Sequence, residues 1–544
     1  MTEPATQQPS PSQSSDGRAA AGKLSRIFRT KDPNQLVDDC SEPHRQMKKS
    51  LTWFDLIAFG VGATIGSGIF ALTGTAAAGA AVGAAGPFWD TPLINFVLHS
   101  PLGREGAGPA LVVSFIIAAI TCGFTAMCYA ELAAMIPVSG SAYTFAYASL
   151  GEVVAWIIGW DLILEYGVGN VAVAVSWSDY FLQFLHGMTG LKIPLWLTTD
   201  PTTAAVKIAL PLDSPMRQLY SNMDLPSFFG QAVAFNLPAF AIVAFITWLL
   251  IVGISESAKL NAWMVFIKTA ICLFFIGYGA MHVNPQNWVP FAPSGFAGIM
   301  GGAAIVFFAF IGFDAVSSTA EETKNPQRDM PIGMIGSLII CTILYVAVSM
   351  VLTGIMPYKT YLNDAAPVAT ALGGHPWAQM LVAAGALAGM TSVLLVFQLG
   401  QPRIFMAMAR DGLLPKVFGD LHKKYRTPVV PTLLTGVLVA VSCLLVDIGE
   451  AANLCNIGTL SAFILVCGGV IVLRKTHPNQ PRPFKCPGSP WLPGLGIASC
   501  LCLMLSLPVI TWVRFFVWMG VGMLIYFGYG FRNNNEKNRQ NSST

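Results

Sequence analysis

Apolar residues occur along the chain in runs of about 20 residues, the length that an α-helix needs to cross a bilayer. Short stretches rich in charged residues, Gly and Pro separate the runs. The runs predict an all-α integral membrane fold with about twelve transmembrane helices. These lie near residues 53–79, 109–136, 150–183, 232–253, 257–282, 297–320, 331–356, 376–401, 429–447, 450–473, 490–508 and 513–531.

Composition agrees with this pattern, because 54% of the residues are hydrophobic and only 11% are charged. Soluble domains carry about 25% charged residues. The first fifty residues contain no apolar segment, so the sequence predicts no cleaved signal peptide. Residues 1–50, which are rich in Ser, Gln, Pro and charge, predict a disordered basic cytoplasmic tail, and residues 532–544 a second cytoplasmic tail.

Lys and Arg residues accumulate in alternate loops, together with the N-terminal segment. This positive-inside bias predicts a multi-pass protein of the plasma (inner) membrane with both termini in the cytoplasm. Topology explains the net charge of +3, which therefore gives no support to a nucleic-acid partner. The eleven cysteines fall in predicted spans or on the cytoplasmic side, so we expect neither a disulfide framework nor a metal site.

Motifs of catalysis are missing from the sequence. No GxxxxGK[ST] phosphate loop occurs, and no catalytic constellation or cofactor motif stands out. The sequence therefore argues against an enzyme and against ATP-driven transport by this chain alone. Two long outward loops, 80–108 and 184–231, also lack an enzymatic motif, and their role stays open.

Small residues interrupt the first predicted span in the stretch GVGATIGSGIF. Close helix packing explains Gly60 and Gly62. The group Gly66, Ser67 and Gly68 is different, because it combines helix breakers with a hydroxyl in a medium that penalises unpaired backbone groups. A break there exposes N–H groups at the start of a half-helix, which suits a carboxylate.

The sixth predicted span is interrupted at a corresponding place, in FFAFIGFDAVSSTAEETKNP. Broken helices at matching positions of two halves mark the substrate site in transporters with inverted repeats. Freed carbonyl groups between Phe308 and Ile311 would suit an ammonium group. The layout predicts a first repeat at 51–282, a second at 283–473 and two further helices at 474–531. A ligand that carries both charges, an amino acid, fits the two breaks together.

Ionisable residues inside the predicted spans are candidates for function, because they are costly in lipid. Lys268 lies near the middle of the fifth span, where burial disfavours its ammonium form. We expect Lys268, Glu165 and Asp314 to take part in proton coupling. A permanently paired ammonium that holds helices together is the alternative for Lys268. Asp161 lies four residues before Glu165 on the same helix face, and packing or capping is expected of it.

Several long motifs resemble those of one protein family, and they occur in the same order along the chain as in that family. They are GVGATIGSGIFALTG, CYAELAAMIPVSGSAYTFAYASLGE, FIGFDAVSSTAEETKNPQRDMPIGMIGSL and GQPRIFMAMARDGLLP. The chain from about Met47 to about Phe531 resembles the amino acid–polyamine–organocation superfamily. More narrowly, it resembles the cationic amino acid transporter family and its bacterial proton-coupled amino acid permease relatives.

The resemblance implies a LeuT-type fold, with a five-plus-five inverted repeat, two further helices, and helices 1 and 6 broken. It assigns substrate contacts to the two breaks, at Ile65, Gly66, Ser67, Gly68, Phe308, Ala309, Phe310 and Ile311. It also implies that Phe308 covers the substrate as a gate, that Glu131 takes part in gating, and that Lys268 is poised near the first break.

We therefore expect a secondary active transporter that imports L-amino acids with protons by alternating access. The pocket walls look largely apolar, with Phe308, Met390 and Gln398 nearby, which favours small neutral amino acids and leaves cationic ones open. An amino acid or polyamine exchanger without proton coupling, a non-transporting amino acid sensor and a channel are the alternatives. Oligomeric state and any accessory subunit cannot be read from the sequence.

Overall fold

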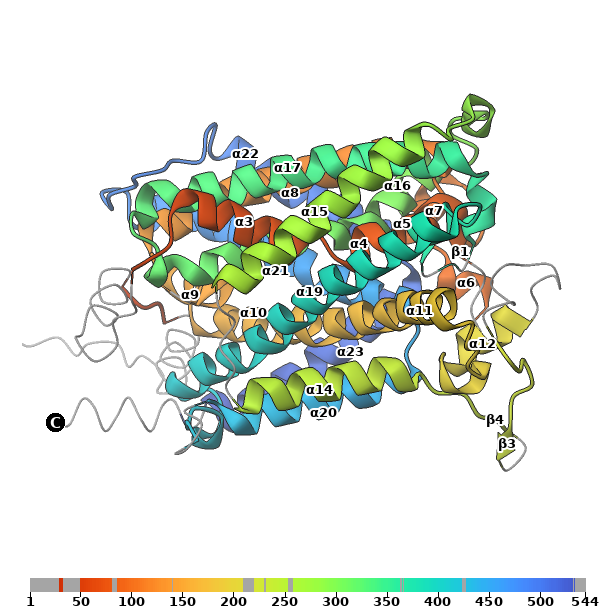
Figure 1. Cartoon of the computed structure of the whole chain (residues 1–544). Helices are drawn as coiled ribbons and strands as arrows, with labels where there is room; N and C mark the ends of the chain where they lie inside the picture. The colour runs from red at the N-terminus through yellow and green to blue at the C-terminus, as the bar shows by residue number, and fades with distance from the viewer. Residues whose placement is uncertain are drawn as a thin grey trace, which may run out of the picture.

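The computed structural model describes residues 29–32, 49–80, 86–138, 140–208, 220–228, 231–252, 258–362, 364, 366–422, 427–531 and 533. This part of the chain is predominantly helical, and most of its helices run along one common direction as a bundle (Figure 1). Nearly all of the predicted tails, 1–50 and 532–544, lies outside the described residues.

Three helical segments occupy the first predicted span: α3 (Trp53–Thr64), α4 (Ser67–Phe70) and α5 (Leu72–Ala78). The next long helix is α8 (Leu111–Met135). It is followed by the short α9 (Ser141–Ser149), and then by a long run made of α10 (Glu152–Ile163), the π-helical η2 (Leu164–Val168) and α11 (Gly169–Thr189).

The remaining spans follow the same order as the apolar runs. They are α14 (Leu237–Val252), α15 (Ala258–Ala280), α16 (Gly295–Val306) with the 3-10 segments η5 (Phe307–Phe310) and η6 (Asp314–Glu322), α17 (Pro326–Ile355), α19 (Pro376–Arg410), α20 (Val429–Leu445), α21 (Ile448–Thr476), α22 (Trp491–Leu505), and α23 (Val509–Ile525) with η9 (Tyr526–Gly530).

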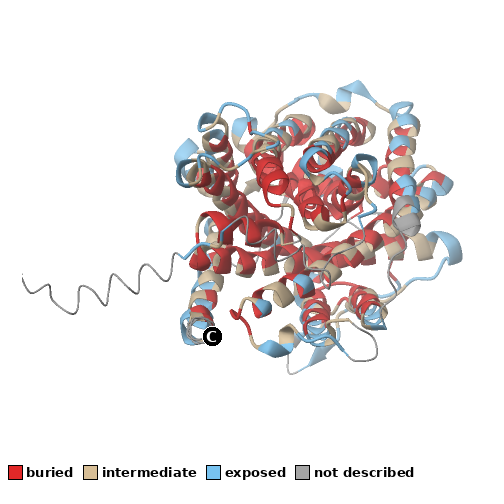
Figure 2. Cartoon of the chain, turned by 90° about the vertical axis from the view of Figure 1, so that its left-hand side faces the viewer, coloured by how far each residue is buried: buried red, intermediate tan, exposed pale blue. Residues whose placement is uncertain are grey.

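Eight helical segments in the described residues are long and apolar enough to cross a membrane, and four apolar helices are shorter. The shorter ones are α3, α14, α20 and α22. Large apolar side chains such as Trp248, Ile343 and Leu524 are more than half exposed. Figure 2 shows the buried residues concentrated toward the middle of the bundle. An apolar outer surface of this kind requires lipid around it, so the chain is a multi-pass membrane protein.

Several predicted boundaries are wrong by five residues or more: the span expected at 150–183 continues to Thr189, and the one expected at 232–253 begins at Leu237. Two further errors occur at a proline. The span expected at 331–356 begins at Pro326, and the span expected at 376–401 continues to Arg410. Pro331 and Pro402 thus lie inside helices. Proline often marks a helix boundary, but a membrane helix can continue past it where neighbouring groups satisfy the freed carbonyl.

Small residues bring α3 and α17 close together. A Cβ atom on Gly60 would overlap the side chain of Ser337, and one on Gly333 would overlap Leu56. Gly336 likewise packs against Ile57. This geometry agrees with the packing role expected for Gly60.

Outside the spans, two loops fold at the end of the bundle where α6 (Pro87–Asp90), α12 (Pro201–Ile208) and β3 (Ser227–Phe228) lie (Figure 1). In the first loop, β1 (Gly79–Ala80) pairs antiparallel with β2 (Arg104–Glu105). In the second, β3 pairs with β4 (Gln231–Ala232).

A buried ion pair attaches the second loop to the bundle. Lys207 on α12 lies 3.2 Å from a carboxylate oxygen of Asp179 on α11 and donates to the hydroxyl of Tyr220 at 2.8 Å. Although burial opposes the ammonium form, Asp179 and Tyr220 raise the pKa of Lys207 above its ordinary value.

Candidate functional site

The first helix is broken where the sequence predicts it. Ile65 leaves the helical conformation at ψ 103°, and Gly66 is extended at φ −154° and ψ −145°. Helical structure resumes at Ser67. The Ser67 hydroxyl is buried and has no hydrogen-bond partner among the described residues. A buried hydroxyl in this state is available to a ligand or a water molecule.

The sixth span is interrupted just after η5. Ile311 is extended, with φ −60° and ψ 131°, and Gly312 has φ 116°, a conformation that glycine adopts without strain. The next helical segment begins at Asp314, whose carboxylate oxygen accepts a hydrogen bond from the Gly312 N–H at 3.3 Å. The sixth helix therefore has its break at Ile311 to Phe313.

The two breaks lie against each other. A Cβ atom on Gly68 would overlap the backbone of Ala309. A Cβ atom on Gly312 would lie 2.8 Å from the carbonyl oxygen of Ala63. The structure thus brings together the two groups of residues expected to bind the substrate, and all of them are buried: Ile65, Gly66, Ser67, Gly68, Phe308, Ala309, Phe310 and Ile311.

Two tyrosines on other helices satisfy carbonyl groups on both sides of the first break. The Tyr345 hydroxyl, from α17, donates to the carbonyl oxygen of Thr64 at 3.0 Å. The Tyr180 hydroxyl, from α11, donates to that of Phe70 at 2.6 Å. Sequence reasoning missed both tyrosines, because nothing in their local sequence connects them to the first span.

Lys268 on α15 contacts the first break, although it lies about 200 residues later in the sequence. Its side chain is fully buried, and its Nζ atom donates to the carbonyl oxygens of Gly62 at 2.5 Å and Ile65 at 3.1 Å. It also donates to the hydroxyl of Ser392 on α19 at 2.7 Å. Oxygen atoms thus replace water around the ammonium group, which is what a charge in this position needs.

Two buried carboxyl groups, on η2 and at the start of η6, form a second group of ionisable residues near the sixth break. Glu165, within the π-helical η2, and Asp314, at the start of η6, are near enough to interact electrostatically. One oxygen of each carboxyl group is buried without a hydrogen-bond partner among the described residues. Both residues are buried. A hydrogen bond between these two carboxyl groups would require a proton on one of them, because a carboxylate has no hydrogen to donate.

Asp161 also faces α21, one helical turn away from Glu165. Its carboxylate accepts a hydrogen bond from the Ser461 hydroxyl. The other carboxylate oxygen of Asp161 is buried and has no partner among the described residues. The contact agrees with the packing role expected of Asp161.

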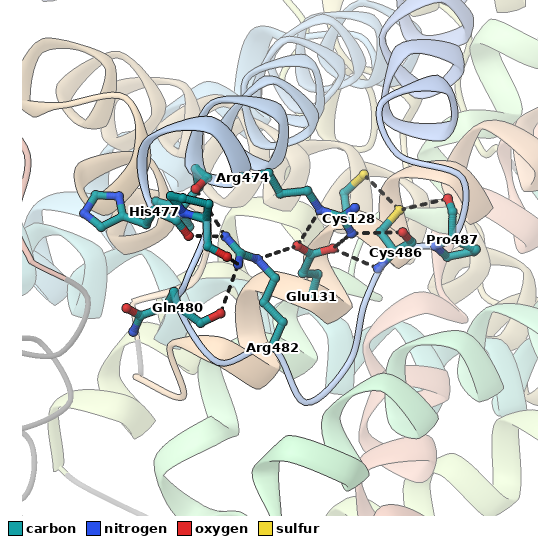
Figure 3. Close-up of polar contacts among 10 residues, drawn as sticks. Cys128, Glu131, Arg474, His477, Gln480, Arg482, Cys486 and Pro487 are labelled. Atoms are coloured by element: carbon teal, nitrogen blue, oxygen red, sulfur yellow. Dashed lines mark hydrogen bonds and ion pairs between the residues drawn. The ribbon is translucent and has the colours of Figure 1, made fainter.

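Glu131 lies at the end of α8, outside the region of the breaks, in a cluster of polar contacts (Figure 3). Arg474 donates to both of its carboxylate oxygens, at 2.5 and 3.0 Å, and the Nε atom of Arg482 lies 3.3 Å from one of them. The backbone N–H of Cys486 donates to the carboxylate at 2.8 Å. Glu131 therefore connects α8 to the end of α21 and to the loop that precedes α22.

Met390 and Gln398, both on α19, are buried and make contacts with α11. The Ser176 hydroxyl lies 3.1 Å from the Met390 sulfur. Gln398 accepts a hydrogen bond from Asn170 and donates to Thr247 on α14 at 3.1 Å. Gln398 thus connects three helices, which explains its place in the membrane without a ligand.

A backbone connection joins the start of α3 to the end of η6. The N–H groups of Ser50 and Leu51 donate to the carbonyl oxygen of Glu322, at 2.9 and 3.0 Å. The Lys324 N–H donates back to the Leu51 carbonyl at 2.9 Å. The two broken helices therefore meet at this end as well as at their breaks.

Comparison with known proteins identifies the family to which the chain belongs. The model of a family described as amino acid permease matches residues 51–529, nearly the whole described chain. The chain belongs to the amino acid permease family. The resemblance found in the sequence motifs is thereby confirmed, and family membership makes the protein a transporter rather than an enzyme.

Individual relatives extend over almost the full length. The chain is 46% identical to the branched-chain amino acid permease BcaP of Bacillus subtilis, over 92% of this chain and 97% of that protein. It is 41% identical to the methylthioribose transporter of the same organism, over 93% and 98%. It is 28% identical to the human cationic amino acid transporter 4, over 96% and 93%.

Proposed function

We propose that this permease imports neutral L-amino acids together with protons, by alternating access, across the plasma membrane. The proposed architecture is LeuT-type, with repeats at 51–282 and 283–473, helices 11 and 12 at 474–531, and both termini in the cytoplasm. The contact of Gly68 with Ala309 carries the proposal, because it joins two broken helices into one buried site.

The substrate would bind between the two breaks. Its carboxylate would accept hydrogen bonds from backbone N–H groups near Gly66 and from the Ser67 hydroxyl, which has no partner among the described residues. Its ammonium group would donate to carbonyl oxygens between Phe308 and Ile311, where the helix ends. The Phe308 carbonyl already accepts a bond from the Ile311 N–H at 3.3 Å and has a second lone pair to offer. Both charges would thus be satisfied without water, as a buried zwitterion requires.

The side-chain preference follows from what surrounds the breaks. Phe308, Phe310 and Met390 are buried, and they offer an apolar environment. A cationic side chain would need the Glu165 and Asp314 carboxyl groups, and in this proposal these two groups hold a proton instead. The name of the branched-chain relative agrees with a neutral substrate. Small and branched neutral amino acids are the proposed class, with cationic ones as the weaker candidates.

Proton coupling would use two groups on opposite sides of the site. Lys268 donates to the Gly62 and Ile65 carbonyls and to the Ser392 hydroxyl, so loss of its proton would leave two N–H donors for these three acceptors and weaken the contacts at the first break. The Glu165–Asp314 pair would hold a proton at the sixth break. Protonation of either group would thereby favour one arrangement of a broken helix over the other.

Uptake into proteoliposomes tests the proposal. Radiolabelled alanine, leucine and arginine are offered with and without an inward proton gradient, to the wild type, Lys268→Gln and Glu165→Gln. We expect saturable, gradient-driven uptake of alanine and leucine by the wild type. Lys268→Gln should abolish the response to the gradient while retaining exchange of substrate across the membrane.

Exchange without protons is the second candidate, since the three oxygen contacts of Lys268 would also suit a permanently charged ammonium. Uptake of the wild type that ignores the proton gradient but requires amino acid on the far side would establish exchange and reject symport. Binding of amino acids without any uptake would favour a sensor.

A further inference from the structure

An open groove of about 690 Å³ lies on the surface of the bundle. One wall is the first half of α17, and the other is the loop between α21 and α22. The residues that line it are Gln327, Arg328, Pro331, Ile332, Ile335, Gly336, Ile339, Pro483 and Phe484.

The groove is apolar along the helix and faces outward. Ile332 is 36% exposed and Ile339 is 54% exposed, although both lie on a span of 30 residues that is apolar enough to cross the membrane. Side chains exposed at this level of a membrane protein face lipid acyl chains. The floor of the groove is therefore suited to hydrocarbon.

The end of the groove at the start of α17 is cationic. Arg328 is exposed there and forms no ion pair with any residue that the structure describes. Lys324 and Lys485, which lie just outside the lining residues in the sequence, are exposed as well. None of the nine lining residues is acidic. Glu321 and Glu322 precede α17 and the buried Asp329 follows Arg328, but no ion pair joins them to Arg328 among the described residues. Glu131 is already occupied by Arg474 and Arg482 (Figure 3).

We propose that this groove binds an anionic phospholipid. The phosphate of its headgroup accepts hydrogen bonds from the Arg328 guanidinium and the Gln327 amide. One acyl chain lies along Ile332, Ile335 and Ile339. A guanidinium binds phosphate oxygens in a fork that fits their spacing, and basic pockets beside membrane helices select anionic headgroups over zwitterionic ones.

Hydrogen bonds within the protein hold the loop that forms the second wall of the groove. Arg482 donates to the carbonyl oxygens of His477 and Gln480, and the Glu131 cluster holds Arg482 and Cys486 on either side of Pro483 and Phe484. A groove with preset walls loses little conformational entropy when an acyl chain enters it. The same span packs on α3 through Gly333 and Gly336, so a bound lipid also stabilises the helix that supports the first break.

Native mass spectrometry of the full-length protein tests this proposal. The protein is taken from nanodiscs that contain phosphatidylcholine alone or mixed with phosphatidylglycerol, and retained lipids are counted. We expect the wild type to retain phosphatidylglycerol and to gain thermal stability from it. Arg328→Gln should lose both effects. Arg403→Gln, which removes another exposed arginine on α19, should keep both.

A second variant, Ile339→Trp, tests the acyl-chain contact while Arg328 stays in place. It should also reduce the retained phosphatidylglycerol. Equal retention by Arg328→Gln and the wild type would overturn the proposal, and so would equal retention of phosphatidylcholine and phosphatidylglycerol. Displacement by soluble glycerol phosphate would show that the site recognises the phosphate alone and not a lipid. These measurements do not depend on transport, so they stand whether or not the proposed function holds.

Discussion

The backbone of Gly68 lies so close to Ala309 that a Cβ atom added to Gly68 would overlap the Ala309 Cα atom. This contact is the point where the first and the sixth helix meet at their breaks. Gly68→Ala should therefore force the two segments apart, destabilise the protein by roughly 1–3 kcal/mol and abolish uptake of amino acids. Thermal unfolding and proteoliposome uptake measure the two effects.

Gly123→Ala on α8 is the matched control, since a Cβ atom there would meet nothing within 4 Å. It should leave both the melting temperature and uptake at the wild-type level. Normal uptake by Gly68→Ala would show that the breaks are not in contact in the transporting protein.

Loss of the hydroxyl of Tyr345 should weaken the first break. Tyr345→Phe keeps the ring, which packs against Phe115 and Phe310, and removes only the donor to the Thr64 carbonyl. A buried carbonyl without a donor costs about 1–3 kcal/mol. We expect a lower melting temperature and a several-fold lower rate of uptake. Tyr529→Phe, at a partly exposed position of η9, should change neither quantity.

Removal of one partner of the buried Lys207–Asp179 pair should be more costly than removal of both. Lys207→Met leaves the Asp179 carboxylate buried without its ion pair, for which a loss of about 3–5 kcal/mol is typical. The double variant Lys207→Met/Asp179→Asn should recover most of that loss. Chemical or thermal unfolding of the three proteins gives the comparison, and additive losses would contradict the assignment of a direct pair.

Asp364, in the loop before α18 (Pro367–Thr370), should make stability depend on pH. Burial raises the pKa of its carboxyl from an ordinary 3.8 to about 6, and Asp179 contributes in the same direction. The hydrogen bond from the Ala366 N–H at 2.8 Å and the charge of Lys207 oppose the rise. The folded protein thus binds this proton more tightly than the unfolded chain. The stability that the protonated Asp364 carboxyl group contributes is therefore fully present below pH 3.8, and it is lost as the pH rises through about 6.

Asp364→Asn keeps the acceptor for the Ala366 N–H and removes the titration. The variant should melt at a higher temperature than the wild type at pH 7, and the difference should shrink toward pH 4. Melting curves of both proteins, measured between pH 4 and pH 7, test this prediction. A constant difference between the two proteins would assign the pH dependence to another group.

Much of the fold could be predicted because lipid imposes a simple rule on the sequence. Each apolar run coincides with a helix or with consecutive helical segments, since a backbone in lipid has few other ways to satisfy its hydrogen bonds. Two of the boundary errors occur at Pro331 and Pro402, where a local rule for ending a helix gives way to packing by neighbouring helices.

The positions of the two breaks could also be predicted, because Gly66, Ser67 and Gly68 are unfavourable in an intact membrane helix. The surroundings of the breaks could not. Ser392, Tyr180 and Tyr345 lie 124, 110 and 281 residues away from the groups that they contact. Hydroxyl side chains are common in membrane helices, where they often bond to their own helix, so these three do not stand out in the sequence.

The connection between Leu51 and Glu322 to Lys324 consists of backbone atoms only. Substitution of a side chain leaves such bonds in place, apart from a proline that removes an N–H group. The sequence at this end can therefore change widely while the start of α3 and the end of η6 stay joined. Conservation of side chains is thus a poor guide to this contact, because its strength does not depend on them.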